Sequence, residues 1–305
     1  ETVLVPRPSY PLFDYLAALE SARVAAYSIV YDGRWSLDLT ALERALAAAG
    51  PEAPRAVVLV NPNNPTGSAL RRSERLALEA LCAPRAVPLI SDEVFFDYLE
   101  TPPDGPGSGD PIVSLASPIT PAAGASIAGP SGGRSPGLAA PTFTLGGMSK
   151  ACGLPQMKLG WIIVGGPEEA AAEALARLDL VADTYLSVGA PVQRAAARLL
   201  DLGDGIRDRI RLRVRENRAH LAAVIGPASS CRLLESDGGW SAVVRVPAVV
   251  PEEDLVLRLL QEDGVLVHPG YFFDFPREAH LVLSLLPEPG TFREAVRRIL
   301  GRVER

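Results

Sequence analysis

The sequence predicts an α/β fold, in which a mostly parallel sheet with helices on both faces precedes a small C-terminal α+β domain. Short β-rich runs alternate with helical patterns through the first half, which is typical of βαβ units. Residues 55–60 form a continuous apolar run, as in strands buried on both faces. We expect a large domain over residues 1–200, an interdomain helix over 201–225 and a small domain over 226–305.

In the first half, strands are predicted at residues 1–5, 25–31, 55–60 and 87–90, and helices at 39–49, closed by Gly50, and at 70–82. Residues 101–141 interrupt this order, because they are rich in Pro, Gly, Ser and Ala and nearly uncharged. An interdomain linker and a surface loop are both compatible with that composition. We favour a loop, since the strand predicted at 142–145 follows at once and should rejoin the same sheet.

A further strand is predicted at residues 160–164, and helical patterns dominate from residue 168 onward. They cover residues 168–178, 191–200 and 206–224, and the last is dense in Arg and Glu and long enough to bridge two domains. The remaining pattern is mixed, which is why a separate α+β domain is expected. It consists of strands at 241–246, 265–268 and 280–285, and helices at 252–262 and 291–303.

Composition narrows the classes of partner. The 305 residues carry a formal net charge of -6 with a pI of about 5.3, which does not favour nucleic acid or an anionic membrane surface. No apolar run reaches the roughly 18 residues of a membrane span. The cysteines, Cys82, Cys152 and Cys231, lack metal-ligand spacing and suit a reducing compartment. We therefore expect a cytoplasmic protein without metal, nucleic-acid or membrane partners.

Two further features concern rare residues. The only methionines are Met148 and Met157, and the chain opens inside an apparent strand, so we expect an N-terminal segment to be absent.

The only lysines are Lys150 and Lys158, beside 28 arginines. Arginine has evidently replaced lysine wherever a positive charge suffices. A lysine amine can act as a nucleophile and a guanidinium cannot. Lys150 and Lys158 are therefore candidate functional residues, and the alternative is that both were retained by chance.

Polar residues follow the predicted strands at the edge where α/β sheets bind ligands. Asn64 lies in the turn-forming segment Asn61 to Gly67, where a plain loop is the alternative, and its amide can donate a hydrogen bond to a phenolate oxygen. Asp92 ends the next strand and can pair with a protonated pyridine nitrogen, although a helix N-cap is commoner for a lone Asp.

A candidate amine stands at the end of the next predicted strand. Ser149 and Lys150 close the run that begins at residue 142, after a Gly146-Gly147 pair that permits close backbone approach. Lys158 can neutralise a phosphate as a point charge, and Tyr10 can stack on an aromatic ring.

Taken together, these segments resemble the class I/II pyridoxal-phosphate aminotransferases of fold type I. The resemblance rests on NPNNPTG, SDEVFFDY and SKACGLPQMKLGW in that order and spacing, and it extends to VLVPRPSYPLF, APVQRAAARLL and GVLVHPGYFFDF. It covers essentially the whole chain. The resemblance implies pyridoxal 5'-phosphate as cofactor, a ping-pong transfer between an amino donor and a keto acid acceptor, and a homodimer.

The resemblance also implies roles. Lys150 corresponds to the catalytic lysine that forms the Schiff base with the cofactor, and Asp92 to the partner of the pyridine nitrogen. Asn64 corresponds to the donor to the phenolate oxygen, and Tyr10 to the ring-stacking aromatic. Ser149 belongs to the same cofactor-binding motif as Lys150. Lys158 falls where the family usually has a phosphate-binding Arg.

Three positions depart from the family pattern. Phe95 lies in the cofactor-binding segment where most members have a Tyr, so one hydrogen bond to the cofactor is lost. Gly147 stands where a phosphate-binding Ser or Thr is common. Val282 falls where the family usually has the Arg that binds the substrate carboxylate, which weakens the expectation of an ordinary α-amino acid substrate. The family's N-terminal Gly-rich phosphate turn is expected in the absent segment.

Two alternatives remain open. A lyase, decarboxylase or racemase would use the same Lys150 and Asp92, so those residues do not exclude one. Some transcription regulators carry an aminotransferase-like domain behind a helix-turn-helix, and the upstream sequence would reveal it. Nothing basic in this chain favours the regulator.

Overall fold

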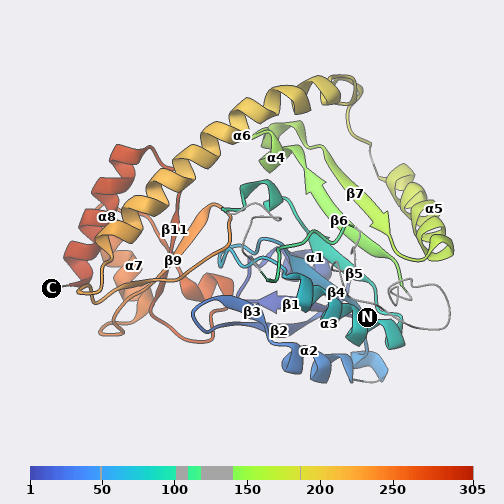
Figure 1. Cartoon of the computed structure of the whole chain (residues 1–305), viewed down its shortest axis with the longest axis horizontal. Helices are drawn as coiled ribbons and strands as arrows, with labels where there is room; N and C mark the ends of the chain where they lie inside the picture. The colour runs from blue at the N-terminus through green and yellow to red at the C-terminus, as the bar shows by residue number, and fades with distance from the viewer. Residues whose placement is uncertain (49, 101–108, 118–139, 186, 305) are drawn as a thin grey trace.

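The computed structural model describes residues 1–48, 50–100, 109–117, 140–185 and 187–304, and a seven-stranded sheet is its largest element (Figure 1). The strand order is β3-β2-β1-β4-β5-β6-β7. The five central strands are parallel, while β3 and β7 pair antiparallel at the two edges. The mostly parallel sheet is therefore confirmed. Its strands are β1 Thr2–Arg7, β2 Arg23–Tyr31, β3 Trp35–Leu37, β4 Pro54–Val60, β5 Leu89–Asp92, β6 Thr142–Gly147 and β7 Gly160–Gly165.

Helices cover both faces of this sheet. The chain moves from β1 to β2 in one direction and then passes over β1 to reach β4, so right-handed crossovers put α1 on one face and α2 and α3 on the other. The core between the sheet and α2 and α3 includes Leu42, Val57, Leu78 and Leu89, all fully buried. The helices of this part are α1 Leu12–Leu19, α2 Leu39–Leu46, α3 Arg72–Cys82, α4 Met148–Ala151 and α5 Glu168–Thr184.

A second, smaller sheet forms the C-terminal part. It is antiparallel, in the order β10-β11-β9-β8, and the expected small α+β unit is confirmed. Its core includes Leu259, Leu281 and Leu285, each fully buried beneath α7 and α8. The elements are β8 Arg232–Leu233, β9 Ser241–Arg245, α7 Glu252–Gln261, β10 His268–Pro269, β11 His280–Ser284 and α8 Pro289–Val303.

The two sheets share a small hydrophobic cluster. Ile29 and Trp35 of β2 and β3 pack there with Val243, Phe273 and Val282 of the C-terminal part. This contact fixes the small sheet against the edge of the large one.

Helix α6 (Ala190–Val224) runs across the molecule from β7 to the small sheet, and Figure 1 shows it spanning the top of the fold. The sequence-based expectation of two helices, at 191–200 and 206–224, was wrong. Gly203 lies inside the continuous helix and allows close packing on α4, since a Cβ there would lie 2.6 Å from the Sγ of Cys152. The predicted domain boundary at residue 200 thus falls inside a continuous helix, and the domain division stays a prediction.

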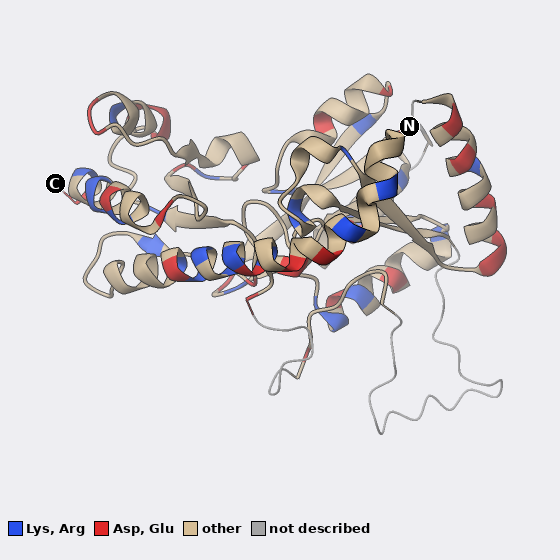
Figure 2. Ribbon diagram, turned by 90° about the horizontal axis from the view of Figure 1, so that it is seen from above, with Lys and Arg blue, Asp and Glu red and all other residues tan. Residues whose placement is uncertain are grey.

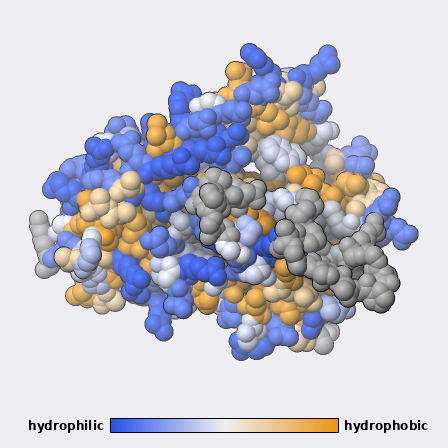
Figure 3. Space-filling model, in the orientation of Figure 1, coloured by the Kyte–Doolittle hydropathy of each residue, from blue (hydrophilic) through white to orange (hydrophobic). Residues whose placement is uncertain are grey.

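Most charged residues on α6 face solvent, whereas Arg218 turns inward and pairs with Glu100. Figure 2 shows blue and red bands alternating along the helix, and Figure 3 shows hydrophilic side chains following it. Ion pairs of the i,i+3 type, Arg207–Asp204 and Arg211–Asp208, lie on its surface. Near β7 the surface is instead hydrophobic, where Ile162 is 45% exposed.

Other differences from the expected elements are small. Helix α1 was not predicted, and the helix expected at 39–49 ends at Leu46, because the chain turns into the 3₁₀ helix Gly50–Glu52. The strand expected at 265–268 was wrong in its bounds, because β10 is His268–Pro269 and shares only His268 with that range. The strand at 142 rejoins the sheet beside β5, as expected, whereas residues 101–108 and 118–139 of the predicted loop lie outside the described part. The other 3₁₀ helices are Ala83–Arg85, Phe96–Tyr98, Pro155–Met157 and Gly270–Phe273.

Within the described ranges, no helix is both long and apolar enough to cross a membrane.

Candidate active site

The carboxyl ends of four parallel strands meet at one edge of the large sheet. Tyr10 follows β1, Asn64 follows β4, Asp92 ends β5 and Lys150 follows β6. The crossovers diverge between β1 and β4, and such a divergence opens a crevice at the carboxyl edge of an α/β sheet. Four candidate residues from distant parts of the sequence are therefore brought to one edge.

Lys150 is held by the short helix α4. Met148, in the same helix, is fully buried, and the helix packs on α6 through Cys152. The hydroxyl of Tyr98 donates a hydrogen bond to the carbonyl oxygen of Lys150 at 2.6 Å. These contacts fix the backbone that carries the amine.

The Lys150 amine points into an aromatic corner. Its Nζ lies 5.7 Å from the ring centre of Phe95 and 6.0 Å from that of Trp240. The two rings meet edge to face, with centres 5.3 Å apart. Aromatic faces attract a cation electrostatically, so the two rings hold the Lys150 amine at the cavity wall.

Asp92 is half-buried, and its Oδ1 accepts a hydrogen bond from the backbone N–H of Val94 at 3.1 Å. Burial raises the pKa of this carboxyl, while the Val94 N–H and the charge of Lys150 act in the opposite direction. A poorly solvated carboxylate binds a protonated nitrogen more strongly than an exposed one. Asp92 is thus suited to pairing with a cationic ring nitrogen, and it caps no helix.

Asn64 lies in a loop that is fastened to the small sheet. Gly67, at φ 68°, accepts hydrogen bonds at its carbonyl from the N–H groups of Asp237 and Gly238. A Cβ at Gly67 would lie 2.3 Å from the carbonyl oxygen of Gly238, so no other residue fits. The same turn places Trp240 and Ser241, and the Ser241 hydroxyl is 3.4 Å from the Oδ1 of Asn64.

Lys150, Asn64, Trp240 and Ser241 line an open cavity of about 710 Å³, and Asp92 is not part of its lining. Its aromatic lining is formed by Tyr10, Tyr15, Phe95, Trp240, Phe272 and Phe273.

Polar groups are fewer in this cavity. Asn64, Ser241, His268 and Ser284 line it, and Lys150 is the one lining residue with a full charge among the residues the structure describes.

The remaining predicted site residues lie outside this lining. Ser149 is half-buried in α4, beside Lys150. Lys158 is exposed, and its left-handed backbone (φ 52°) ends the 3₁₀ helix Pro155–Met157. Gly146 packs beneath Trp161, whose Nε1 would lie 2.3 Å from a Cβ at that position. The glycine pair before Lys150 thus serves the packing of the β6–β7 hairpin.

Sequence reasoning missed several lining residues. Trp240 and His268 were not singled out, although Gly238-Gly239 before Trp240 is a turn signal. Phe272 and Phe273 belong to a segment that contributed to the family resemblance, but no role was given to them. Their position depends on how the small sheet docks, which no local pattern reveals.

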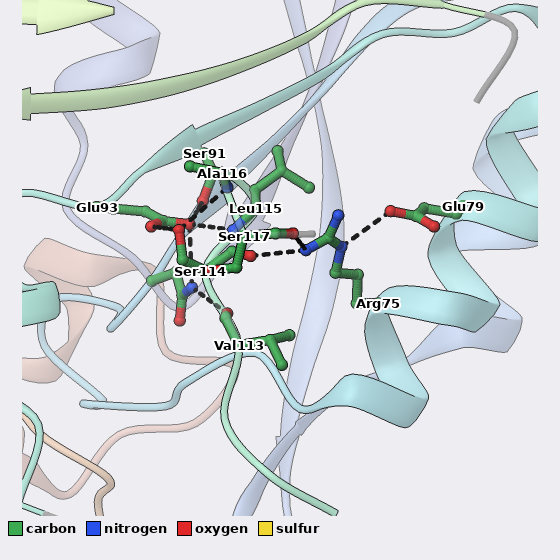
Figure 4. A network of polar contacts seen from close by, with 10 residues as sticks. Arg75, Glu79, Ser91, Glu93, Val113, Ser114, Leu115, Ala116 and Ser117 are labelled. Atoms are coloured by element: carbon green, nitrogen blue, oxygen red, sulfur yellow. Dashed lines mark hydrogen bonds and ion pairs between the residues drawn. The ribbon is translucent and has the colours of Figure 1, made fainter. Parts of the chain in front are cut away.

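A buried polar network supports the Asp92 end of the site (Figure 4). The Glu93 carboxylate accepts hydrogen bonds from Ser91 Oγ (3.0 Å), Ser114 Oγ (2.5 Å) and the N–H of Leu115 (2.7 Å). The Nδ2 of Asn61 donates a fourth at 3.3 Å. These bonds tie residues 113–117 to the end of β5 and so fix the backbone beside Asp92.

The site fits the cofactor that the sequence resemblance implies. An amine, a poorly solvated carboxylate, an amide and aromatic faces together suit an aromatic aldehyde with a basic ring nitrogen. The Ser149 hydroxyl and the Lys158 ammonium are the candidates for its phosphate among the predicted residues. In the described part of the chain, no cluster of His, Cys, Asp or Glu is arranged to hold a metal.

Comparison with known proteins gives a consistent result. The sequence profile of the family described as "Aminotransferase class I and II" matches residues 1–299. The chain is 27% identical over 307 residues to the alanine aminotransferase of Mycobacterium tuberculosis, covering 98% of this chain and 64% of that one. It is 28% identical over 302 residues to the arginine–pyruvate transaminase AruH of Pseudomonas aeruginosa, covering 98% and 68%.

The chain thus spans about two thirds of the length of these relatives, 64% and 68%. Among solved structures, it resembles the tyrosine aminotransferase of Leishmania infantum, with a TM-score of 0.81, 21% identity and coverage of 100% and 69%. It also resembles the pyridoxal-phosphate-bound C–S lyase of Staphylococcus hominis, with a TM-score of 0.77, 17% identity and coverage of 100% and 71%. At these identities the structural matches show the fold alone.

Proposed function

Because the chain belongs to the class I and II aminotransferase family, whose cofactor is pyridoxal phosphate, we propose that its full-length protein transfers an amino group from an amino donor to a keto acid. The observation that supports this most is the placement of Lys150 and Asp92. They come from neighbouring parallel strands, with Asp92 in register with Leu145, and the aromatic cavity lies beside them. An amine and an acid are thus presented at one strand edge.

In this proposal each residue has a separate task. The bound cofactor supplies a carbonyl carbon that accepts an amine and a ring that withdraws electrons from the reacting carbon. The Nζ of Lys150 holds and returns the proton of that carbon, since its flexible side chain lies at the cavity wall. Asp92 keeps a proton on the ring nitrogen, Asn64 donates to the ring oxygen, and Tyr10 covers the ring face.

Ser149 and Lys158 are proposed to bind the phosphate, and Phe95 to pack beside the ring. Phe95 already contacts Trp240 edge to face, so it positions the ring by shape and not by hydrogen bonding.

Product analysis tests the reaction type. The full-length protein, loaded with pyridoxal phosphate, would be incubated with an amino donor and a keto acid. We expect the donor to give its carbonyl product and the acceptor to give an amino acid in equal amounts. Release of ammonia or carbon dioxide in proportion to the donor consumed would instead assign a lyase or decarboxylase, and interconversion of enantiomers a racemase.

We propose further that the protein is a cytoplasmic homodimer. The apolar side chains on α1 support the dimer, since Tyr15 is 68% and Leu19 80% exposed beside the cavity. Three buried free cysteines are compatible with a reducing compartment. Sedimentation of the full-length protein measures the oligomeric state, and a monomer at micromolar concentration would contradict the dimer.

A further inference from the structure

The wall of the cavity opposite Lys150 comes from the small sheet. Val282 of β11 lines it, 2% exposed, and is paired in register with Val243 of β9 and His268 of β10. Ser284 lines the cavity two residues further along the same strand, so both side chains project from one face. Phe272 and Phe273 extend this wall from the 3₁₀ helix Gly270–Phe273, which lies between β10 and β11 in the chain.

This wall offers no charge to a carboxylate. Apart from Lys150, every lining residue of the described part is neutral or an imidazole. The hydroxyls of Ser241 and Ser284, which are opposite each other in the β9–β11 register, are uncharged. A carboxylate bound against Val282 would lose its hydration and gain no cationic partner, which is costly.

Nearby guanidinium groups are already engaged by carboxylates. Arg7, on the strand that leads to Tyr10, pairs with Asp14 and Asp274, each at 2.5 Å. Arg71, which follows the Asn64 loop, pairs with Asp237. Releasing Arg71 to a ligand would leave the partly buried Asp237 without its partner, whereas releasing Arg7 would break two ion pairs at once.

We propose that the amino donor of this enzyme is an amine with an aromatic or long apolar substituent and without a carboxylate on the carbon that bears the amino group. This inference rests on the proposed amino transfer and adds the substrate class. The apolar substituent packs among Phe272, Phe273 and Leu286, while the reacting carbon lies toward Lys150. The Val282 surface then covers the position that a carboxylate would occupy.

A matched pair of donors tests the proposal. Phenethylamine and L-phenylalanine differ only by the carboxylate, and both would be given to the full-length, cofactor-loaded protein with a keto acid. We expect kcat/KM to be at least about tenfold higher for phenethylamine, because the charged donor must be desolvated without a partner. Equal or higher kcat/KM for L-phenylalanine would overturn the proposal.

Binding of unreactive analogues keeps the two proposals separate. Calorimetry on the same protein would compare 3-phenylpropan-1-ol with 3-phenylpropanoate, and we expect the alcohol to bind at least about tenfold more tightly. Tighter binding of the carboxylate would overturn the substrate class. If neither donor reacts while the alcohol still binds more tightly, the amino transfer is wrong and the selectivity of the wall stands.

Variants that add a guanidinium to the wall give a second test. Val282→Arg and Ser284→Arg are made in parallel, because Val282 is buried and Ser284 is exposed. Val282→Leu is the matched control, since it changes bulk without adding charge. We expect either Arg variant that folds to shift the ratio of the two analogue affinities toward the carboxylate by about tenfold, and Val282→Leu to leave it. An unchanged ratio in a folded Arg variant contradicts the assigned position.

Discussion

The two sides of the cavity are built differently. On the large-sheet side, Lys150 and Asp92 lie at the ends of central strands, backed by the fully buried Met148 and by the Glu93 network. On the small-sheet side, Phe272 is 51% exposed and His268 lies on a strand of two residues. One side is embedded in the hydrogen-bonded core of a sheet, whereas the aromatic part of the other side is carried by the two-residue strand β10 and the 3₁₀ helix Gly270–Phe273.

A buried carboxylate anchors the segment that carries the aromatic side chains of the small-sheet side. Glu252, 2% exposed at the start of α7, accepts hydrogen bonds from the N–H groups of Gly270 (2.8 Å), Tyr271 (3.3 Å) and His280 (2.9 Å). The difference indicates that the groups proposed for proton transfer are fixed by the fold itself. The residues that would select the substrate depend on a local anchor, so they can change without disturbing the chemistry.

The largest expected effect comes from removing the amine on the rigid side. Lys150→Ala should lower turnover by roughly 10⁴-fold, because nucleophile and proton carrier are lost together. Borohydride reduction of the loaded wild-type protein, followed by peptide mapping, should place the label on Lys150. Lys158→Ala, which removes only the proposed phosphate contact, should keep the label on Lys150, and label on Lys158 in the wild-type protein would refute the assignment.

Loss of the carboxylate on the same side should have a smaller effect. Asp92→Asn should retain cofactor but reduce kcat by about 10- to 100-fold, the value of one charge-assisted hydrogen bond. The measurement is steady-state kinetics together with cofactor content. Near-normal kcat at full cofactor content would show that Asp92 does not act on the ring nitrogen.

Disturbing the other side should affect binding more than chemistry. Glu252→Ala leaves the N–H groups of Gly270 and His280 without acceptors, so the aromatic wall should loosen. We expect KM for an aromatic donor to rise about tenfold, with kcat changed less than about threefold. Glu252→Gln, which keeps one acceptor oxygen, is the matched control and should lie between. A fall in kcat with an unchanged KM would show that the small-sheet side affects the chemistry and not the binding of the donor.

The smallest expected effect concerns stability and pH. Burial raises the pKa of Asp92 above its ordinary value of 3.8, so the folded, cofactor-free protein binds a proton that the unfolded chain has lost. The free energy of unfolding should therefore decrease as pH rises from about 4 through the raised pKa. Asp92→Asn removes the free-energy cost of burying an ionised carboxylate. The cofactor-free variant should therefore gain stability relative to wild type between about pH 4.5 and pH 8. Denaturant unfolding measures the difference, and a constant difference would contradict it.

Much of the large-sheet side was predictable because its causes are local. Apolar runs followed by polar residues gave the central strands and the positions of Asn64, Asp92 and Lys150 at their ends. The parallel order then brings those ends together whatever else the chain does. The role of Ser149 came from the resemblance alone, and that of Lys158 from its charge together with the resemblance; like the roles of the other site residues, they stay predictions.

What only the tertiary structure decided depends on contacts between distant segments. The close packing of α6 on α4 rests on Gly203 meeting Cys152, and the position of Trp240 rests on the bonds between Gly67 and residues 237–238. The sequence by itself determined which reactive side chains stand at the ends of the strands. Apolar runs and rare lysines are local features that can be recognised without knowing the tertiary structure. The docking of the small sheet decided which aromatic residues face these reactive side chains. The docking depends on the packing of Ile29 and Trp35 against Val243, Phe273 and Val282, which lie more than 200 positions away in the sequence.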